Sequence, residues 1–270
     1  MSPGPYSDLS RPPLRQASLA RGLLVPGGLW TAVRVVPVTG STNADVAAAA
    51  ARGEPEGLVL VAEEQRSGRG RLDRVWQMPA RAGLLFSVLL RPPLEPARWG
   101  WLPLLAGVAC AEAVESVTGV EAALKWPNDV MVGERKLAGI LAERRADALV
   151  LGIGLNVLLA REELPVPTAT SLALETDEPV DRDPVLRAVL RALEHRYRRF
   201  AGAGGDPERS QLLEEYRARC ATIGREVRVL LPGDRELRGQ AVDVDVEGRL
   251  VVEGPDGSVP VAAGDVVHVR

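Results

Sequence analysis

Only two lysines, Lys125 and Lys136, occur among the 33 basic residues of this 270-residue chain, and all the others are arginines. Lysine is ordinarily among the commonest residues, so the two positions that keep it stand out. Its ammonium group is a compact point charge, which the planar guanidinium of arginine does not reproduce. We therefore interpret Lys125 and Lys136 as candidate site residues. The alternative is that both lysines survived by chance.

Two further cations lie in the segment Ser67-Gly68-Arg69-Gly70-Arg71. Glycines allow backbone N–H groups to approach an anion, and arginines can bind two oxygens of a carboxylate or phosphate at once. The segment is not a Walker loop, because no Gly-Lys-Ser/Thr follows it. Taken alone, it is equally well explained as a solvated turn or as an arginine–glycine tract that binds RNA.

Three short polar segments follow at the borders of apolar runs. Residues 125–129 read Lys-Trp-Pro-Asn-Asp, residues 136–141 read Lys-Leu-Ala-Gly-Ile-Leu, and residues 152–156 read Gly-Ile-Gly-Leu-Asn. Gly139 would let a ligand lie against bare backbone, and Asn156 offers an amide to the edge of a base. Each segment alone is also explained by turn formation or strand packing.

Together these residues predict a cationic site that works without a covalent intermediate. The chain has two histidines, His195 and His268, which we interpret as structural, so a nucleophile–histidine mechanism has little support. Cations suit a reaction between anions, such as attack of a carboxylate on the α-phosphate of ATP. Two like unit charges about 4 Å apart repel by roughly 1 kcal/mol in water and roughly 4 kcal/mol at an effective dielectric near 20. Neutralising that charge is then the main catalytic need.

Apolar periodicity and turn residues predict the elements that position this site. Strands are expected at 29–39, 57–63, 83–90, 124–132, 136–143 and 148–158, and helices at 41–51, 99–118, 183–200 and 207–220. The run 124–132 is interpreted as one strand that passes through a kink at Trp126-Pro127. Gly133-Glu134 is the two-residue turn that follows it.

Changes in composition predict three regions. Residues 1–28 are rich in Pro, Gly, Ser and Arg, and we predict a disordered tail, too short for a helix-turn-helix domain. From residue 223 short β-like runs alternate with Pro/Gly/Asp turns, as expected for a small β-barrel over 223–270. Residues 29–222 then form one larger domain, which contains all the polar segments above.

The overall composition excludes several classes of protein. The net charge is −3, with no basic stripe for nucleic acid, so specific DNA binding is not expected. The longest apolar run, residues 102–111, contains Pro103 and Gly107 and is too short to cross a bilayer. The N-terminus lacks the apolar core of a signal peptide, and two cysteines suit a reduced compartment. We expect a cytoplasmic protein without membrane association.

In their order along the chain, the polar segments resemble the biotin–protein ligases. The matching segments are Thr-Gly-Ser-Thr-Asn at 39–43, Gln65 with Gly-Arg-Gly-Arg at 68–71, the three segments at 125–129, 136–141 and 152–156, and Ala-Thr-Ser-Leu at 169–172. The resemblance extends from about residue 30 to the C-terminus. It implies an α+β fold, with a mixed-sheet catalytic domain similar to class II aminoacyl-tRNA synthetases and a C-terminal SH3-like barrel.

The resemblance also implies the reaction and its partners. Biotin and ATP, with Mg²⁺, would form biotinyl-5'-AMP, and biotin would then pass to a lysine of a biotin carboxyl carrier protein. The biotin head group would border Ser41, Thr42, Asn43 and Gln65. The loop that closes over biotin and the adenylate would consist of Gly68, Arg69, Gly70 and Arg71.

Roles for individual residues at the phosphate and adenine follow from the same resemblance. Lys136 would contact the carboxylate and the α-phosphate, which makes it the best candidate for stabilising the transition state, together with Arg69 and Arg71. Asp129 would orient the acceptor amine or help to hold a metal. Trp76 would stack on adenine. The remaining ligand-binding residues would be Lys125, Gly139 and Asn156.

Two alternative functions remain at this stage. A lipoate–protein ligase of the same fold would need a long apolar slot, whereas Ser41, Thr42 and Gln65 favour polar recognition. A non-catalytic nucleic-acid module is disfavoured by the negative net charge. Exposed strand edges would allow a sheet-extending homodimer when ligand binds. The short N-terminal tail predicts that the chain has no repressor activity.

Overall fold

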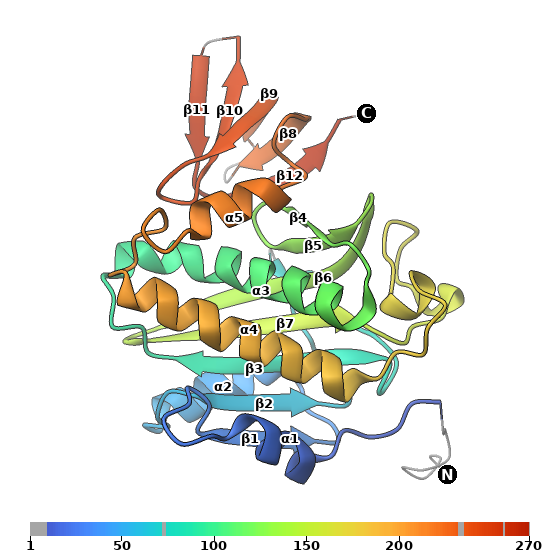
Figure 1. Ribbon diagram of the computed structural model, residues 1–270. Coiled ribbons are helices and arrows are strands. Elements are labelled where there is room, and N and C mark those ends of the chain that lie inside the picture. Colours follow the sequence, from blue (N-terminus) through green and yellow to red (C-terminus); the bar gives the residue numbers. More distant parts are fainter. Residues whose placement is uncertain (1–9, 72–73, 232–234, 256, 270) are drawn as a thin grey trace.

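The computed structural model describes residues 10–71, 74–231, 235–255 and 257–269, which form two sheets with flanking helices (Figure 1). The larger sheet has the order β1-β2-β3-β7-β6-β5-β4. β1 and β2 are parallel, and the other neighbours in this sheet are antiparallel, so the sheet is mixed. Its strands are β1 (Ala32–Val36), β2 (Leu58–Ala62), β3 (Gly83–Leu90), β4 (Ala123–Lys125), β5 (Asp129–Val132), β6 (Arg135–Arg145) and β7 (Ala148–Asn156).

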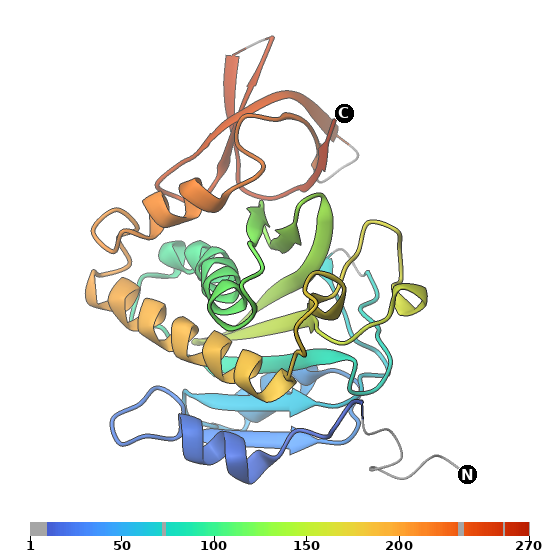
Figure 2. The same ribbon diagram turned by 45° about the vertical axis from the view of Figure 1, so that its right-hand side comes forward.

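The two long helices, α3 (Trp101–Thr118) and α4 (Arg182–Gly202), pack on one face of this sheet (Figure 1). The shorter α2 (Thr42–Ala51) lies on the opposite face, as Figure 2 shows, and its Val46 and Ala49 pack against Leu58 and Leu89. Single 3-10 turns lie at η2 (Pro96–Gly100), η3 (Arg161–Glu163) and η4 (Leu172–Leu174). Because α2 covers only part of its face, the ends of β6 and β7 remain open on that side.

Of the described residues, the stretch Pro96–Thr118 is long and apolar enough to cross a membrane by length and composition alone. That stretch comprises η2 and α3, and most of it is buried inside the protein. Cys110 and Val114 of α3, for example, are fully buried in the main core. The apolar character of α3 is therefore explained by its packing between α4 and the sheet.

The prediction that residues 1–28 are disordered is wrong for the described part of that region. α1 (Gln16–Leu23) forms there and buries Leu19 and Leu23 in the main core. Its Gln16 side chain accepts a hydrogen bond from Val35 N on the edge strand β1. Composition predicted disorder. However, a few apolar residues at helical spacing are enough to stabilise a helix when they pack against the sheet edge and α4. Residues 1–9 lie outside the described residues.

The interpretation of 124–132 as one strand is also wrong. β4 and β5 are antiparallel neighbours, with Lys125 paired to Asp129, so residues 126–128 form a turn. Two side chains fix this turn: Trp126 donates from Nε1 to Gly248 O, and Asn128 donates from Nδ2 to Ile140 O. The polar segment 125–129 is therefore folded back on itself, which brings its first and last residues side by side.

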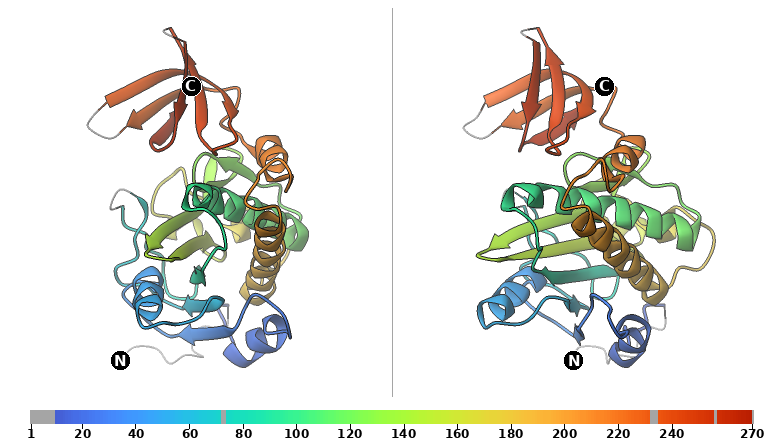
Figure 3. Two further views of the ribbon diagram at one scale, coloured as in Figure 1. Left: turned by 90° about the vertical axis from the view of Figure 1, so that its left-hand side faces the viewer. Right: turned by 60° about the vertical axis from the view of Figure 1, so that its left-hand side comes forward.

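The second sheet has the order β11-β10-β9-β8-β12 and is antiparallel throughout. Its strands are β8 (Glu226–Leu231), β9 (Arg235–Val244), β10 (Leu250–Gly254), β11 (Gly257–Val261) and β12 (Asp265–His268). Figure 3 shows it at one end of the molecule, next to α5 (Leu212–Arg219). The domain boundary predicted at residue 222 falls between α5 and β8.

Two buried indoles connect the domains. Trp101 of α3 donates from Nε1 to Val246 O, and Trp126 donates to Gly248 O, in the same β9–β10 turn. Gly248 adopts a positive φ of 77° and packs on the Trp101 ring. These contacts place the last strand of the second sheet, β12, at the rim of the open face of the first.

Candidate active site

A cleft of about 920 Å³ lies over the open ends of β6 and β7. Its walls come from the start of α2, the loop after β2, the β4–β5 turn and the terminal strand β12. Of the residues predicted from the sequence, all but Gly68 line it. The lining residues of that set are Ser41, Thr42, Asn43, Gln65, Arg69, Gly70, Arg71, Trp76, Lys125, Asp129, Lys136, Gly139 and Asn156.

Gly68 contributes by letting two parts of the loop approach each other. Trp76 N donates to Gly68 O, and Gly70 N donates to Arg74 O, so the loop folds back on itself. A Cβ at Gly68 would lie 2.3 Å from Trp76 O, which no side chain tolerates. Gly68 thus fixes the position of Trp76.

Bare backbone forms the floor of the cleft beneath the Trp76 ring. A Cβ at Gly154 would lie 2.4 Å from Trp76 Cε2, and one at Gly139 would lie 2.9 Å from Trp76 Cζ3. The Lys136 ammonium lies 5.4 Å from the ring centroid, within the range of a cation–π contact. Trp76 Nε1 is buried without a hydrogen-bond partner. A flat aromatic surface therefore adjoins a cation in this part of the cleft.

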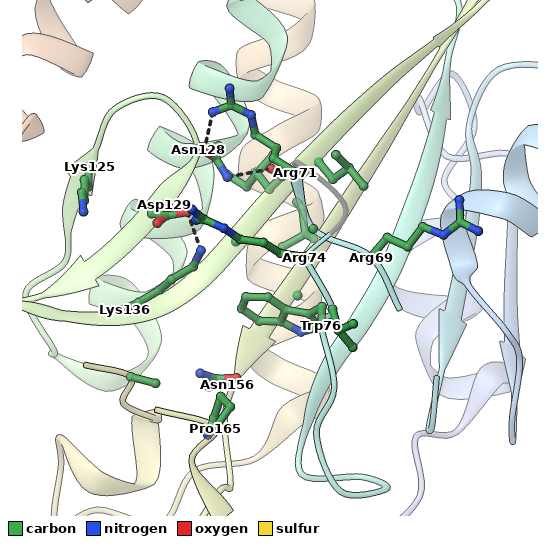
Figure 4. Close-up of a pocket in the computed structure, with 18 of the residues that line it drawn as sticks. Arg69, Arg71, Arg74, Trp76, Lys125, Asn128, Asp129, Lys136, Asn156 and Pro165 are labelled. Carbon is green, nitrogen blue, oxygen red and sulfur yellow. Dashed lines mark hydrogen bonds and ion pairs between the residues drawn. The ribbon is translucent and has the colours of Figure 1, made fainter. Parts of the chain in front are cut away.

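Lys136 and Asp129 form the charged centre of the cleft (Figure 4). Lys136 Nζ lies 2.6 Å from Asp129 Oδ1. This oxygen is buried and makes an ion pair but no further hydrogen bond. The Lys136 backbone is fixed from both sides, because its N–H donates to Thr168 O and its carbonyl accepts from Thr170 N. The ammonium group therefore projects from a rigid strand.

Arg71 and Arg74 bring the loop to the same centre. Arg71 donates to Asn128 Oδ1 at 2.9 Å and to Gly264 O at 3.3 Å, and burial lowers its pKa. Arg74 forms an ion pair with Asp265 of β12, and that hydrogen bond raises the pKa of Arg74. Loop and barrel thus meet at the edge of the cleft.

The four predicted cations do not all converge. Arg69 is exposed, and Figure 4 shows its guanidinium directed away from Arg71, Arg74 and Lys136. Arg74, which the sequence interpretation did not select, takes its place beside Asp129. Arg71 and Lys136 lie where a cationic site requires them.

The opposite end of the cleft is polar and uncharged. Ser41 caps α2, with its hydroxyl accepting from Ala44 N. Thr42 donates from its backbone N to Gln65 Oε1 at 2.7 Å, and its Oγ1 lies 3.0 Å from the same oxygen. Asn43 is buried, and its amide nitrogen donates to Glu143 Oε2 at 2.8 Å. Thr42, Asn43 and Gln65 all line the cleft, and each is held in place by hydrogen bonds within the protein.

Asn156 ends β7 and lies below the Trp76 ring in Figure 4. Its Nδ2 donates to Thr170 O at 2.8 Å, and the side chain is buried. The Thr170 backbone in turn donates to Lys136 O. The segment 169–172 thus links the amide of Asn156 to the strand that carries Lys136.

His268 was interpreted as structural, and the structure also places it on the cleft wall. Its Nε2 lies 3.1 Å from Thr222 Oγ1, which accepts from Trp126 N. Burial, with Lys125 and Arg225 nearby, lowers the pKa of His268 to about 4. A neutral imidazole therefore supports the β4–β5 turn from the barrel.

Sequence reasoning missed Arg74, Asp265 and the cleft position of His268. Arg74 had a usable signal, since it lies two residues before Trp76 in the same loop. Asp265 had none, because about 190 residues separate it from its partner Arg74. Within the described residues no group of three His, Cys, Asp or Glu side chains could hold a metal ion.

Comparison with known proteins shows which family this chain resembles. Residues 35–159 match the Biotin/lipoate A/B protein ligase family, and residues 222–269 match the Biotin protein ligase C terminal domain. The chain is 46% identical over 268 residues to the Biotin--[acetyl-CoA-carboxylase] ligase of Mycobacterium tuberculosis, covering 97% of this chain and 98% of that protein. It is 34% identical to the Bifunctional ligase/repressor BirA of Bacillus spizizenii, over 78% of this chain and 66% of that protein.

A solved structure agrees with these relatives. The biotin protein ligase from Aquifex aeolicus in complex with biotin and ATP superposes with a TM-score of 0.75 at 30% identity, covering 88% of this chain and 98% of that chain. Fold, cleft and sequence similarity therefore point the same way, and this chain belongs to the biotin protein ligase family.

Proposed function

We propose that this chain joins biotin to ATP as biotinyl-5'-AMP and transfers the biotinyl group to a lysine of a biotin carboxyl carrier protein. The family membership makes it an ATP-dependent biotin ligase rather than a lipoate ligase, since its C-terminal domain and its relatives are those of biotin ligases. The observation that carries the proposal is the layout of one continuous cleft. An uncharged polar wall at Thr42 and Gln65 lies opposite a cationic centre at Lys136, Arg71 and Arg74.

This layout fits a carboxylic acid with a polar head group. The head group would bind at Thr42 and Gln65, and the carboxylate would extend toward Lys136. The biotin carboxylate attacks the α-phosphate of ATP, the bond to the β-phosphate breaks, and pyrophosphate leaves. Lys136 and Arg71 would offset the repulsion between these anions and stabilise the charge that develops on the α-phosphate.

The second step requires a neutral amine. The lysine amine of the acceptor attacks the carbonyl of the mixed anhydride, an amide forms, and AMP leaves with release of a proton. Asp129 would accept a hydrogen bond from the incoming amine. Trp76 would stack on adenine and Asn156 would bind its edge. The roles of Ser41, Asn43, Gly70, Lys125 and Gly139 as further neighbours of the ligands belong to this proposal.

Mg²⁺ would bind with ATP. This cation usually keeps several waters and takes one or two carboxylates together with substrate phosphates. Asp129 offers a carboxylate of that kind: its buried Oδ1 lies 2.6 Å from Lys136 Nζ and makes no further hydrogen bond. Mg²⁺ would neutralise charge on the phosphates, while Lys136, Arg71 and Arg74 act from the protein.

Three further features belong to the proposal. The acceptor would be the carrier domain of acetyl-CoA carboxylase or a related biotin enzyme, as the name of the mycobacterial relative suggests. The protein would act in the cytoplasm, without membrane association or specific DNA binding. A homodimer on ligand binding would have to use an edge other than the part of β1 where Gln16 occupies Val35 N.

A pyrophosphate-release assay tests the first step. Purified protein with ATP and Mg²⁺ should release pyrophosphate with biotin and not with lipoate, and adding a biotin carrier domain should produce a 1:1 biotinylated product by mass spectrometry. Activity with lipoate alone would disprove the assignment. A DNA titration at physiological salt should give only weak, sequence-independent binding. Tight binding to a specific sequence would contradict this part of the proposal.

A further inference from the structure

Ser87 lies behind the polar wall of the cleft and does not line it. It belongs to the central strand β3 and is fully buried. Its Oγ lies 2.7 Å from Thr42 Oγ1 and 2.6 Å from Asn43 Oδ1. A serine on this strand thus touches both polar residues at the start of α2.

The direction of the hydrogen bond between Ser87 and Asn43 follows from the partners of Asn43. Its Nδ2 donates to Glu143 Oε2 at 2.8 Å and lies 3.4 Å from Leu141 O, and both of these oxygens can only accept. The amide oxygen must therefore face Ser87. Because an amide oxygen cannot donate, Ser87 gives its one hydroxyl proton to Asn43.

Thr42 has a similar constraint on its other side. Its backbone N–H donates to Gln65 Oε1, so Gln65 turns its oxygen toward Thr42, and Thr42 Oγ1 lies 3.0 Å from that oxygen. Ser87, Thr42, Asn43 and Gln65 thus share three oxygen–oxygen contacts. The two hydroxyls supply only two protons for these contacts, so one contact always lacks a proton.

We propose that Ser87 is a specificity-determining positioning residue that makes the Thr42 hydroxyl a hydrogen-bond acceptor toward the cleft. The Thr42 proton is used by Ser87 or Gln65, so the Thr42 hydroxyl oxygen can only accept a hydrogen bond from a ligand N–H in the cleft. A ligand with a bare oxygen at that place meets the lone pairs of Thr42. This inference rests on the proposed function, because the ring ureido group of biotin provides such an N–H.

Ser87→Ala relaxes this constraint. With the serine oxygen gone, the Thr42 hydroxyl is free to turn toward a ligand oxygen, while Gln65 Oε1 keeps its bond from Thr42 N. Discrimination against ligands that lack the N–H should therefore fall. Asn43 loses its donor at the same time, so biotin itself should bind more weakly.

Calorimetric titration without ATP measures this discrimination directly. The probes are biotin and its two cyclic carbamate analogues, in which oxygen replaces one or the other ureido N–H. Wild-type protein should strongly prefer biotin to one of the two carbamates. In Ser87→Ala this preference should fall by roughly tenfold or more, and the Kd for biotin should rise several-fold, whereas kcat for adenylate formation at saturating biotin stays within about twofold.

Two variants separate polarity from packing. Ser87→Cys keeps a donor, but a weaker one on a larger atom, so it should lose the preference, and its melting temperature reports the cost of packing the sulfur. Ser210→Ala removes another buried hydroxyl, one that donates to Asp206 O far from the cleft, and should leave the preference unchanged. An undiminished preference for biotin in both Ser87 variants would overturn the inference. Failure of the wild type to bind biotin would instead overturn the proposed function.

Discussion

Lys136 Nζ and Asp129 Oδ1 lie 2.6 Å apart, and their ion pair joins two adjacent strands at the centre of the cleft. The same ammonium contacts the Trp76 ring on its other side. Lys136 is thus held between a carboxylate and an aromatic surface, which restricts a side chain that is otherwise flexible. A fixed point charge of this kind needs little reorganisation when negative charge develops beside it.

Lys136→Arg should reduce adenylate formation strongly although the positive charge is kept. A guanidinium is larger and planar, so it cannot lie both 2.6 Å from Asp129 and beside Trp76 in the same way. We expect kcat for pyrophosphate release to fall roughly 10- to 100-fold. This loss is smaller than the one expected when a transition-state donor is removed entirely, because the positive charge is kept. Lys125→Arg, the matched change at the other lysine, should cost much less. Equal losses in the two variants would contradict the special role of Lys136.

The Arg74–Asp265 pair and the bond from Arg71 to Gly264 O join the loop to β12. Asp265→Asn should loosen the loop, so that trypsin cleaves faster at the exposed Arg66 and Arg69. Because Arg74 is well exposed, the effect should be modest, about two- to fivefold in cleavage rate. Asp243→Asn, which breaks the exposed ion pair to Arg217 elsewhere on the barrel, is the control and should not change cleavage. A loop indifferent to Asp265 would show that the barrel does not restrain it.

Local patterns predicted most of the larger sheet. β3 was predicted at residues 83–90 because a run of apolar residues ends at prolines, and the structure gives the same bounds. The polar segments were recognised because their residue types suit an anion site. Contacts between distant segments carry no such signal. Ser87 is one small residue in an apolar strand, and Asp265 is one of many charged residues in the barrel. Their roles arise only when folding brings them to Thr42 and Arg74.

His268 should make the protein sensitive to acid. Its pKa is lowered to about 4 in the fold, whereas an unfolded histidine titrates near 6.5. Between these values the unfolded chain binds a proton that the native state does not, so stability is full above about pH 6.5 and declines as the pH falls toward 4. Since the ring is only half-buried, this contribution is about 1 kcal/mol after allowing for solvent screening.

Melting curves at several pH values test this contribution. Between pH 7 and pH 4.5 the melting temperature of His268→Gln should fall less than that of the wild type. The two falls should differ by about 2–4 °C for a chain of this size. His195→Gln removes the other histidine from α4 and serves as the control. Parallel curves for wild type and His268→Gln would contradict the assignment.

Arg182 and Glu63 form a buried ion pair that should dominate the stability of the N-terminal region. The exposed fraction of the Arg182 side chain is only 2%, and its Nη1 lies 2.6 Å from Glu63 Oε2. Arg182 also donates to Gly83 O and Pro12 O, and Glu63 accepts from Leu14 N. One pair thus joins α4, the residue that follows β2, the start of β3 and the segment that precedes α1.

Arg182→Met should lower the free energy of unfolding by about 3–5 kcal/mol, because it leaves the Glu63 carboxylate buried without its partner. Urea unfolding followed by circular dichroism measures the change. Arg34→Met, which breaks the more exposed pair with Glu54, should cost no more than about 1 kcal/mol. Adding Glu63→Leu to Arg182→Met should recover part of the loss, since an apolar pair removes the uncompensated charge. A double variant less stable than Arg182→Met alone would show that Glu63 stabilises the fold through Leu14 rather than through Arg182.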